Sequence, residues 1–206
     1  MTKQQKLRSI LILGPPGSGK GTLGKFLSTA GNHFHLSSGD IFRGLDPESS
    51  MGKLYHTYAG KGFLVPDGVT IEMWKHYVDG LICTNRYFPS KQFLLLDGIP
   101  RTLSQSIILD QHIEVVKVIV LEMSNIETLV KRMKRRALIE KRQDDADEEV
   151  LKTRMHVYEK ETLELLSHYP KSLISRFNAD QKPLEVLRDV LIELSDLLSH
   201  PESKTV

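Results

Sequence analysis

The chain has 206 residues, of which 26% are charged and 40% hydrophobic, a composition typical of one soluble globular domain. A formal net charge of +2 gives no reason to expect a nucleic acid or a membrane surface as partner, and no apolar run reaches the length of a secretory signal or a membrane span. The single cysteine, Cys83, excludes an internal disulfide, fits a reducing cytoplasm, and is expected to be a small core residue.

Short aliphatic runs alternate with longer helical patterns along the chain. Residues 9–13, 93–96 and 115–121 predict buried strands, and weaker patterns predict two more at 35–36 and 173–177. Asp67 and Ser124 are expected to cap two of the helices. The helices are expected at 20–30, 39–46, 51–60, 68–81, 102–111, 125–136, 147–168 and 183–198. This alternation favours an α/β fold with a parallel sheet that is covered on both faces.

A glycine-rich loop, GPPGSGKGT at 14–22, directly follows the first strand and opens a helix. Glycines let backbone N–H groups approach phosphates, and the helix N-terminus adds partial positive charge. Lys20 supplies a full charge at the β/γ boundary of a nucleoside triphosphate. The common pattern has Ser or Thr immediately after this lysine to hold Mg²⁺, whereas here Gly21 precedes Thr22. The sequence therefore predicts phosphate binding with a less direct hold on the metal.

A charge-dense segment spans 131–149, where a basic stretch changes into an acidic one. A solvated helix–turn–helix is the plain structural interpretation of such a pattern. Arg132 and Arg136 are four residues apart, so on a helix they share one face. Two arginines that close over a triphosphate would offset developing negative charge in a dry site.

The G-K-G-T loop and four further segments together resemble the adenylate kinases and their nucleoside monophosphate kinase relatives. The segments are LSSGDIFR at 36–43, GFLVPD at 62–67, LDGIPRT at 96–102 with Gln105, and the arginine-rich region with Asp144 and Asp145. Lys182 and Pro183 resemble a position at which the family's backbone contacts the donor adenine. The matches run in order from residue 10 to about 190, and together they are highly specific.

The resemblance implies a P-loop fold with a five-stranded parallel sheet and helices on both faces. It implies one kinase domain over 1–206, with a monophosphate-binding flap at 38–67 and a short lid at about 132–145. It implies donor ATP at Gly17, Ser18, Gly19, Lys20, Gly21, Thr22, Arg132, Arg136 and Lys182. It implies acceptor AMP at Ser38, Arg43, Phe63, Leu64, Val65, Gly98, Ile99, Pro100, Arg101, Gln105, Arg142 and Arg154. The expected catalytic charges are Lys20, Arg101, Arg132, Arg136, Arg142 and Arg154.

Asp97 ends a buried strand on the same sheet edge as the phosphate loop, where ligands of α/β folds collect. Its carboxylate is expected to hold Mg²⁺ through water, with Thr22 as a possible further ligand. The resemblance also predicts a cis Ile99–Pro100 bond. Several positions depart from the family pattern: Ser38 stands for Thr, Leu23 for Gln and Ile99 for Phe, and the spacing from Asp145 to Arg154 is one residue longer.

The expected reaction is ATP + AMP ⇌ 2 ADP with Mg²⁺, catalysed by a cytoplasmic monomer. A UMP/CMP kinase on the same scaffold is the nearer alternative, and Gln105, whose amide can pair with an adenine edge, favours AMP. Gln105 as a polar helix residue that faces water is the plain alternative for that side chain. A P-loop switch or ATP-driven motor is the alternative from another class, and ATPase activity without an acceptor would identify it.

Overall fold

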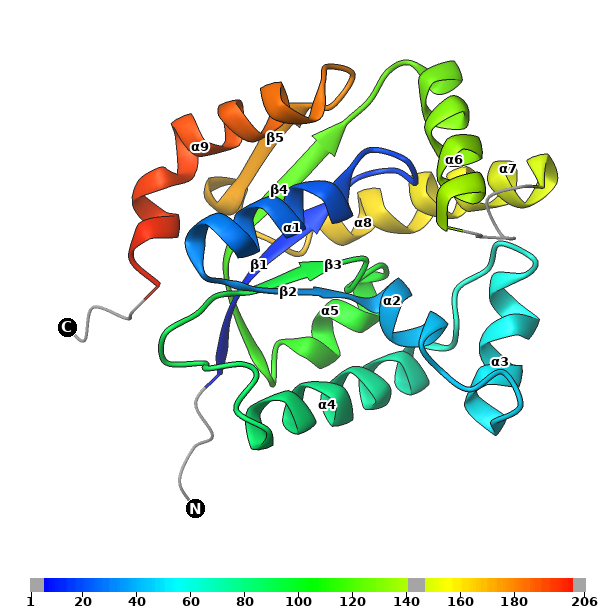
Figure 1. The fold of residues 1–206 in the computed structure, drawn as a ribbon, viewed down its shortest axis with the longest axis horizontal. Helices are drawn as coiled ribbons and strands as arrows, with labels where there is room; N and C mark the ends of the chain where they lie inside the picture. Colours follow the sequence, from blue (N-terminus) through cyan, green and yellow to red (C-terminus); the bar gives the residue numbers. More distant parts are fainter. Residues whose placement is uncertain (1–5, 141–146, 202–206) are drawn as a thin grey trace.

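The computed structural model describes residues 6–140 and 147–201 of the chain (Figure 1). Its centre is a five-stranded parallel sheet of order β2-β3-β1-β4-β5. The strands are β1 (Leu7–Leu13), β2 (Phe34–Ser37), β3 (Leu94–Asp97), β4 (Ile113–Glu122) and β5 (Ile174–Asn178). All five predicted strands and the predicted parallel sheet are confirmed.

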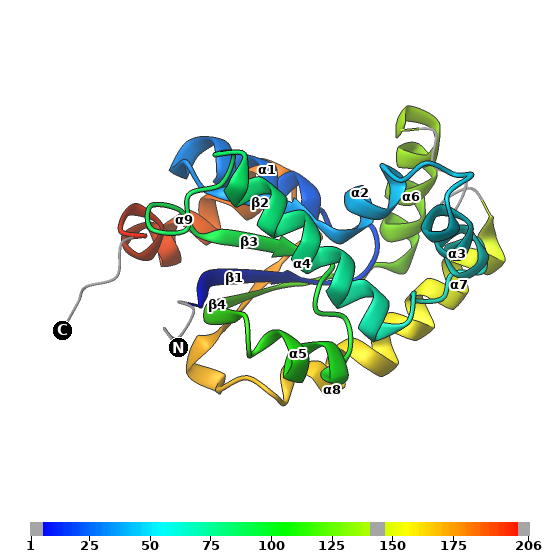
Figure 2. The same ribbon diagram turned by 90° about the horizontal axis from the view of Figure 1, so that it is seen from below.

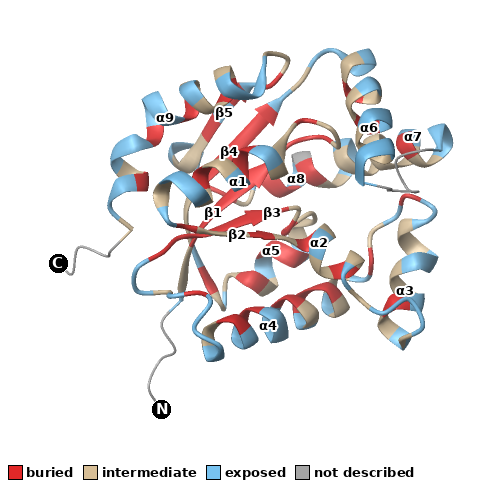
Figure 3. Ribbon diagram, viewed as in Figure 1, coloured by how far each residue is buried: buried red, intermediate tan, exposed pale blue. Residues whose placement is uncertain are grey.

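Helices cover both faces of the sheet, as the continuous aliphatic strands predict (Figure 2). Side chains alternate along β1, so Ile10 and Ile12 pack under α1 (Lys20–Gly31) and α9 (Pro183–Ser199). Leu11 and Leu13 pack on the other side, with α4 (Asp67–Cys83), α5 (Leu103–Leu109) and α8 (Leu163–Leu166). The strands are accordingly the most buried part of the molecule, and the exposed residues gather mainly on the outer helices and loops (Figure 3).

The remaining helices gather beyond the carboxyl ends of the strands (Figures 1 and 2). They are α2 (Ser38–Arg43), α3 (Ser50–Ala59), α6 (Ile126–Glu140) and α7 (Glu148–Val157). The predicted helix at 147–168 proves to be α7, a π-helical turn at Tyr158–Thr162, and α8 in succession. A 3-10 turn at Lys171–Leu173 leads into β5. Arg142, Asp144 and Asp145 lie outside the described residues.

Three local predictions are wrong. Cys83 is exposed rather than in the core, because Val78 and Leu81 already occupy the core side of the last turns of α4. Asp67 does not cap α4; it is the first helical residue, and its carboxylate binds α5 instead. Ser124 does not cap α6, because its hydroxyl donates to Asp180, while the side chain of Asn125 accepts from the Thr128 amide.

No helix within the described ranges combines the length and the apolar character that crossing a bilayer requires.

Candidate active site

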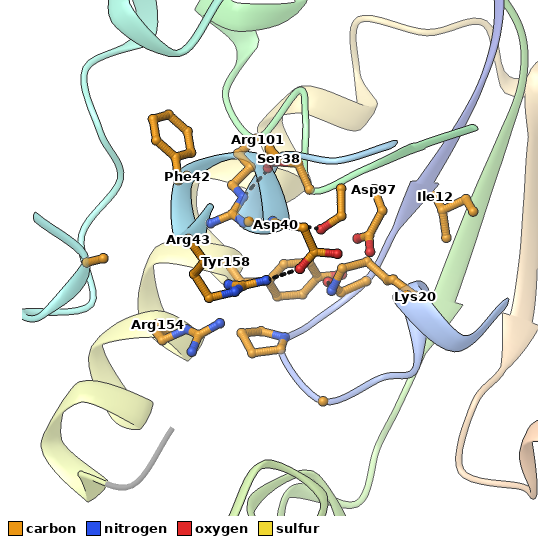
Figure 4. Close-up of a pocket in the computed structure, with 18 of the residues that line it drawn as sticks. Ile12, Lys20, Ser38, Asp40, Phe42, Arg43, Asp97, Arg101, Arg154 and Tyr158 are labelled. Carbon is orange, nitrogen blue, oxygen red and sulfur yellow. Dashed lines mark hydrogen bonds and ion pairs between the residues drawn. The ribbon is translucent and has the colours of Figure 1, made fainter. Parts of the chain in front are cut away.

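A cavity of about 540 Å³ opens at the carboxyl ends of β1 and β3. Its lining comes from the phosphate loop, the start of α2, the turn after β3, and the facing sides of α3, α6 and α7. In Figure 4 the side chains of Lys20, Asp97, Arg101, Arg43 and Arg154 point toward one another across this space. The location follows the general rule that open α/β sheets bind ligands outside the carboxyl ends of their strands.

The phosphate loop folds around the ammonium group of Lys20. Its Nζ donates to the carbonyl oxygens of Gly14 at 2.9 Å and Pro15 at 3.0 Å. Gly19 has a φ of 98° at the N-terminus of α1, where a residue with a side chain would be strained. At Gly14, which has a φ of 153°, a Cβ would lie 2.7 Å from the carbonyl oxygen of Leu121. The glycines therefore allow the tight turn that directs Lys20 and the first amides of α1 into the cavity.

The groups around Lys20 do not supply enough negative charge to balance its ammonium group. Burial in the first place, together with the nearby charges of Arg101, Arg136 and Arg154, lowers the pKa of Lys20 to about 8 against the opposing effect of Asp97. A protonated lysine in such a place is stabilised when an anion arrives. The loop is thus charged, buried and short of a counter-ion, which suits a phosphate group.

Asp97 stands at the end of β3 and is only 8% exposed. Burial by itself would raise the pKa of its carboxyl, but His35, Lys20 and Arg101 outweigh burial, and the pKa lies below its usual value. His35 Nε2 lies 3.7 Å from Asp97 Oδ2. The carboxylate is therefore ionised at neutral pH.

A hard cation such as Mg²⁺ fits the oxygen atoms available here. Asp97 supplies a carboxylate, and Thr22, exposed at the start of α1, supplies a hydroxyl to the same cavity. Within the described ranges no cluster of three or more His, Cys, Asp and Glu side chains forms a metal cage. A cation at this place would take most of its ligands from water and phosphate, which is how Mg²⁺ is usually held beside nucleotides.

The turn after β3 brings two acceptor-site candidates onto one carbonyl oxygen. Ser38 Oγ donates to Gly98 O at 2.6 Å, and Arg101 Nε donates to the same atom at 2.8 Å. Gly98 has a φ of 74°, and a Cβ there would lie 3.0 Å from the Ser38 hydroxyl. The Ile99–Pro100 bond in this turn is cis, as predicted. Burial and the neighbouring charge of Arg154 lower the pKa of Arg101. Its guanidinium thus also lies in a strongly basic, desolvated place.

Gln105 lines the cavity but is only 1% exposed, so the alternative of a helix residue that faces water is wrong. Its Oε1 accepts from the Arg101 amide at 2.8 Å, and its Nε2 donates to Asp67 Oδ1 at 2.7 Å. The side chain is therefore held in place on the side of the cavity that contains Arg101 and Ser38.

Arg132 and Arg136 both line the cavity, as their shared helical face predicts. Arg132 is further engaged with the loop after β5: its guanidinium donates to Ala179 O at 2.9 Å and to Gln181 O at 3.1 Å. Those bonds fix the loop that leads into α9, whose first residue, Pro183, reaches the cavity. Arg132 thus joins α6 to this loop.

Most of the expected site residues come together, but three of the described ones do not. Ser18 is buried beneath the loop, Ile99 is fully buried in the core under the sheet, and Lys182 lies outside the lining. Arg142 lies outside the described residues. The expected residues that line the cavity are Gly17, Gly19, Lys20, Gly21, Thr22, Ser38, Arg43, Phe63, Leu64, Val65, Asp97, Gly98, Pro100, Arg101, Gln105, Arg132, Arg136 and Arg154.

Sequence reasoning missed several lining residues, among them Tyr55, Arg135 and Tyr158. Tyr55 on α3 stacks on Phe42 of α2, with ring centroids 5.3 Å apart and planes 7° apart. An aromatic residue inside a helical pattern indicates packing in general, and nothing local shows that this one would border a cavity. Arg135 lies between Arg132 and Arg136, which the sequence pattern singles out. The density of basic residues in this stretch was the signal that could have indicated it.

Comparison with known proteins agrees with this geometry. The family described as adenylate kinase matches residues 12–174, which include the phosphate loop, both edges of the cavity and α6. The chain belongs to the adenylate kinase family. An adenylate kinase from Flavobacterium psychrophilum is 38% identical over 198 residues, which cover 93% of this chain and 98% of that protein. One from Leptospira biflexa is 35% identical over 82% of this chain and 90% of its own length. One from Borrelia recurrentis is 29% identical over 96% and 99%.

Membership in the adenylate kinase family accounts for the convergence of segments that are distant in sequence. The matched span ends at residue 174, so the N-terminus of α9 lies beyond it. The N-terminus of α9 is therefore linked to the site by the structure alone, through the hydrogen bonds from Arg132 to the loop before α9.

Proposed function

We propose that this chain transfers the terminal phosphoryl group of Mg-ATP to AMP and forms two ADP reversibly. The observation that carries the proposal is the meeting of two phosphate-binding groups in one cavity. The first is the loop around Lys20, and the second is the corner formed by Ser38, Arg43 and Arg101. A hydrolase needs only the first of these. A kinase whose acceptor is itself a phosphate needs both.

The chemistry demands positioning and charge neutralisation rather than a protein nucleophile. Phosphoryl transfer passes through a loose transition state, with charge spread over the equatorial oxygens. Lys20, Arg136 and Arg132 would hold the donor phosphates, while Arg43 and Arg101 would hold the acceptor phosphate. Alignment of the two substrates contributes about 7–11 kcal/mol to lowering the barrier. Arg154, close enough to Lys20 and Arg101 to lower both pKa values, would contact the transferring group.

Mg²⁺ is the proposed cofactor, held through water by Asp97, with Thr22 as a further candidate. When bound, the cation neutralises charge on the oxygens of the triphosphate. The buried carboxylate of Asp97 supports this placement, because His35, Lys20 and Arg101 lower its pKa and keep it ionised beside the phosphate loop.

AMP is the proposed acceptor in preference to UMP or CMP. The relatives reported above carry the name adenylate kinase, and Gln105 offers an amide that is held beside Arg101. One residue can therefore contact the base while the other contacts the phosphate. Ser38 retains the hydroxyl of the family's threonine, and here it supports the turn that carries Arg101 through Gly98.

The proposed moving parts are the flap at 38–67 and the lid at about 132–145, of which residues 132–140 belong to the described helix α6. Closure over both substrates would exclude water and prevent hydrolysis of the donor. We expect these segments to move when a two-headed donor–acceptor analogue binds. An unchanged structure with and without that analogue would contradict the lid. We further propose that the protein acts as a cytoplasmic monomer.

A coupled assay for ADP tests the function directly. Mg-ATP is supplied alone and then with AMP, dAMP, CMP, UMP or GMP, and AMP is expected to give the highest kcat/KM. Gln105→Leu should lower kcat/KM for AMP by at least about 10-fold, because a base edge loses its buried partner. Gln111→Leu, in the exposed turn that follows α5, is the matched control. ADP release from ATP alone, or preference for CMP or UMP, would overturn the proposal.

A further inference from the structure

Asp67 makes two hydrogen bonds that leave its own helix. Its Oδ1 accepts from Gln105 Nε2 at 2.7 Å, and its Oδ2 accepts from Thr102 Oγ1 at 3.0 Å. Asp67 is the first residue of α4 and comes at the end of the flap segment, whereas Thr102 and Gln105 belong to the N-terminal turn of α5. Both carboxylate oxygens are therefore used to hold the segment that follows Arg101.

These bonds leave only one orientation open to the amide of Gln105. Its Oε1 accepts from the backbone N–H of Arg101 at 2.8 Å, while its Nε2 donates to Asp67. An amide turned by 180° would place its oxygen against the carboxylate and its NH₂ against an N–H group. Gln105 is 1% exposed, so water cannot satisfy the groups left unpaired by such a turn.

We propose that Asp67 is a specificity-determining positioning residue, which fixes the Gln105 amide so that the acceptor site takes a 6-amino purine and rejects a 6-oxo purine. The proposal rests on the function proposed above. The fixed amide has one N–H and one oxygen lone pair left for the cavity that it lines. On the N1–C6 edge, adenine offers an acceptor at N1 and a donor at the amino group, which are complementary to that pair.

Inosine monophosphate reverses both positions on this edge, because it has N1–H and a carbonyl oxygen. An amide that turns freely would pair with either base equally well. An amide held by Asp67 meets N–H with N–H and oxygen with oxygen when inosine binds. Selection against the oxo base therefore depends on Asp67, which does not itself touch the base, together with the Arg101 N–H.

The unmodified protein provides the first test. kcat/KM is measured for AMP, for purine riboside 5′-monophosphate, which lacks the 6-substituent but keeps N1 as acceptor, and for IMP. A fixed amide predicts the order AMP, purine riboside monophosphate, IMP, with steps of at least about 10-fold. IMP equal to AMP, or better than the purine riboside, would show an amide that turns freely and would overturn the proposal.

Two variants provide the second test, with Asp79→Asn on the exposed side of α4 as the matched control. Asp67→Asn introduces an amide that pairs with Gln105 in either orientation, and Asp67→Ala removes the partner, so that in both variants the Arg101 N–H alone still opposes a turned Gln105 amide. In both variants the ratio of kcat/KM for AMP to that for IMP should fall at least about 10-fold, with KM for ATP unchanged. A purely structural role would lower activity with both acceptors by the same factor and leave the ratio at its wild-type value.

The outcomes separate this inference from the proposed function. If the unmodified protein fails to phosphorylate AMP, or if Gln105→Leu leaves AMP unaffected, the function or the role of Gln105 is wrong. If AMP selectivity depends on Gln105 but the AMP-to-IMP ratio is unchanged in both Asp67 variants, only the positioning role is wrong. Melting temperatures of the variants, followed by circular dichroism, verify that the ratios come from folded protein, and the acceptor order of the unmodified protein stands without them.

Discussion

Replacing Lys20 by methionine should abolish phosphoryl transfer. It should also remove the pH-dependent free-energy cost of keeping a charged ammonium group buried in the folded protein. Methionine keeps the approximate length of the side chain but carries no charge and no donor. Lost contact between the ammonium and a phosphate in the transition state costs several kcal/mol, so activity should fall by at least about 10³-fold. The second effect is on the free energy of unfolding, and its size follows from the lowered pKa of Lys20.

In the folded protein Lys20 has a pKa of about 8, against 10.5 for a free lysine. A difference of this size corresponds to about 3 kcal/mol of cost for keeping the charge in the folded site. Below pH 8 the lysine is charged in both states, and the folded protein bears the whole cost. Between pH 8 and 10.5 the folded lysine is neutral while the unfolded one is still protonated, so stability rises with pH. Above 10.5 the cost is gone.

The assay is urea unfolding of the wild type and of Lys20→Met at pH 7 and pH 9.5, without nucleotide. The stability of the wild type relative to the variant should increase by about 2 kcal/mol between these two pH values. Lys91→Met, at an exposed surface position, should show no such change relative to the wild type. A wild-type-to-variant difference that is the same at both pH values would refute the electrostatic account of Lys20, and transfer activity within tenfold of wild type would refute its role with phosphate.

Three further changes have definite expected outcomes. Arg43→Ala should raise KM for AMP at least about 10-fold and leave KM for ATP nearly unchanged, in steady-state kinetics with each substrate varied; an equal rise in both would place Arg43 outside the acceptor site. Gly62→Ala should destabilise the protein by about 2 kcal/mol in urea, because Gly62 has a φ of 79° and a Cβ would lie 2.9 Å from the Val150 carbonyl oxygen of α7; a loss under about 0.5 kcal/mol would exclude close flap–α7 packing. Burial lowers the pKa of His33 below 6.5. As the pH falls below 6.5, this histidine takes up a proton in the unfolded chain but resists protonation in the folded chain, so the free energy of unfolding decreases. His33→Phe, which keeps the ring beside Phe93, should therefore lose less melting temperature than wild type between pH 7 and pH 5, and equal losses would contradict this.

The sequence was sufficient to predict the sheet because its information is local. The aliphatic runs of β1, β3 and β4 predict buried strands, and the glycine pattern after β1 predicts the turn that the structure contains. The weaker β2 and β5 were predicted from shorter apolar patterns at 35–36 and 173–177. The predicted β2 was one residue short at each end and the predicted β5 was shifted by one residue, since the flanking residues carry no distinctive pattern.

What the sequence could not supply are the contacts between distant segments. Asp67 looks like a helix cap, and only the fold shows that it binds Gln105, 38 residues away. Arg132 was expected to meet phosphate, but its bonds to Ala179 and Gln181 span 47 and 49 residues. The exposure of Cys83 depends on where α4 ends relative to the core, and no local property of a cysteine determines this.

The near-neutral charge of the whole chain conceals a strongly basic centre. The described lining of the cavity contains eight basic residues, Lys20, Lys25, Arg43, Arg101, Arg132, Arg135, Arg136 and Arg154, and three acidic ones, Asp40, Asp97 and Glu140. The whole chain has a net charge of only +2, so the remainder of the molecule is slightly acidic. A basic excess in a cavity favours small polyanions that fit inside it. The lowered pKa of Lys20 shows that gathering these charges costs stability while the cavity holds no anion. Substrate phosphates would relieve that cost, and so the groups that weaken the free protein are the ones that make it bind two nucleotides together.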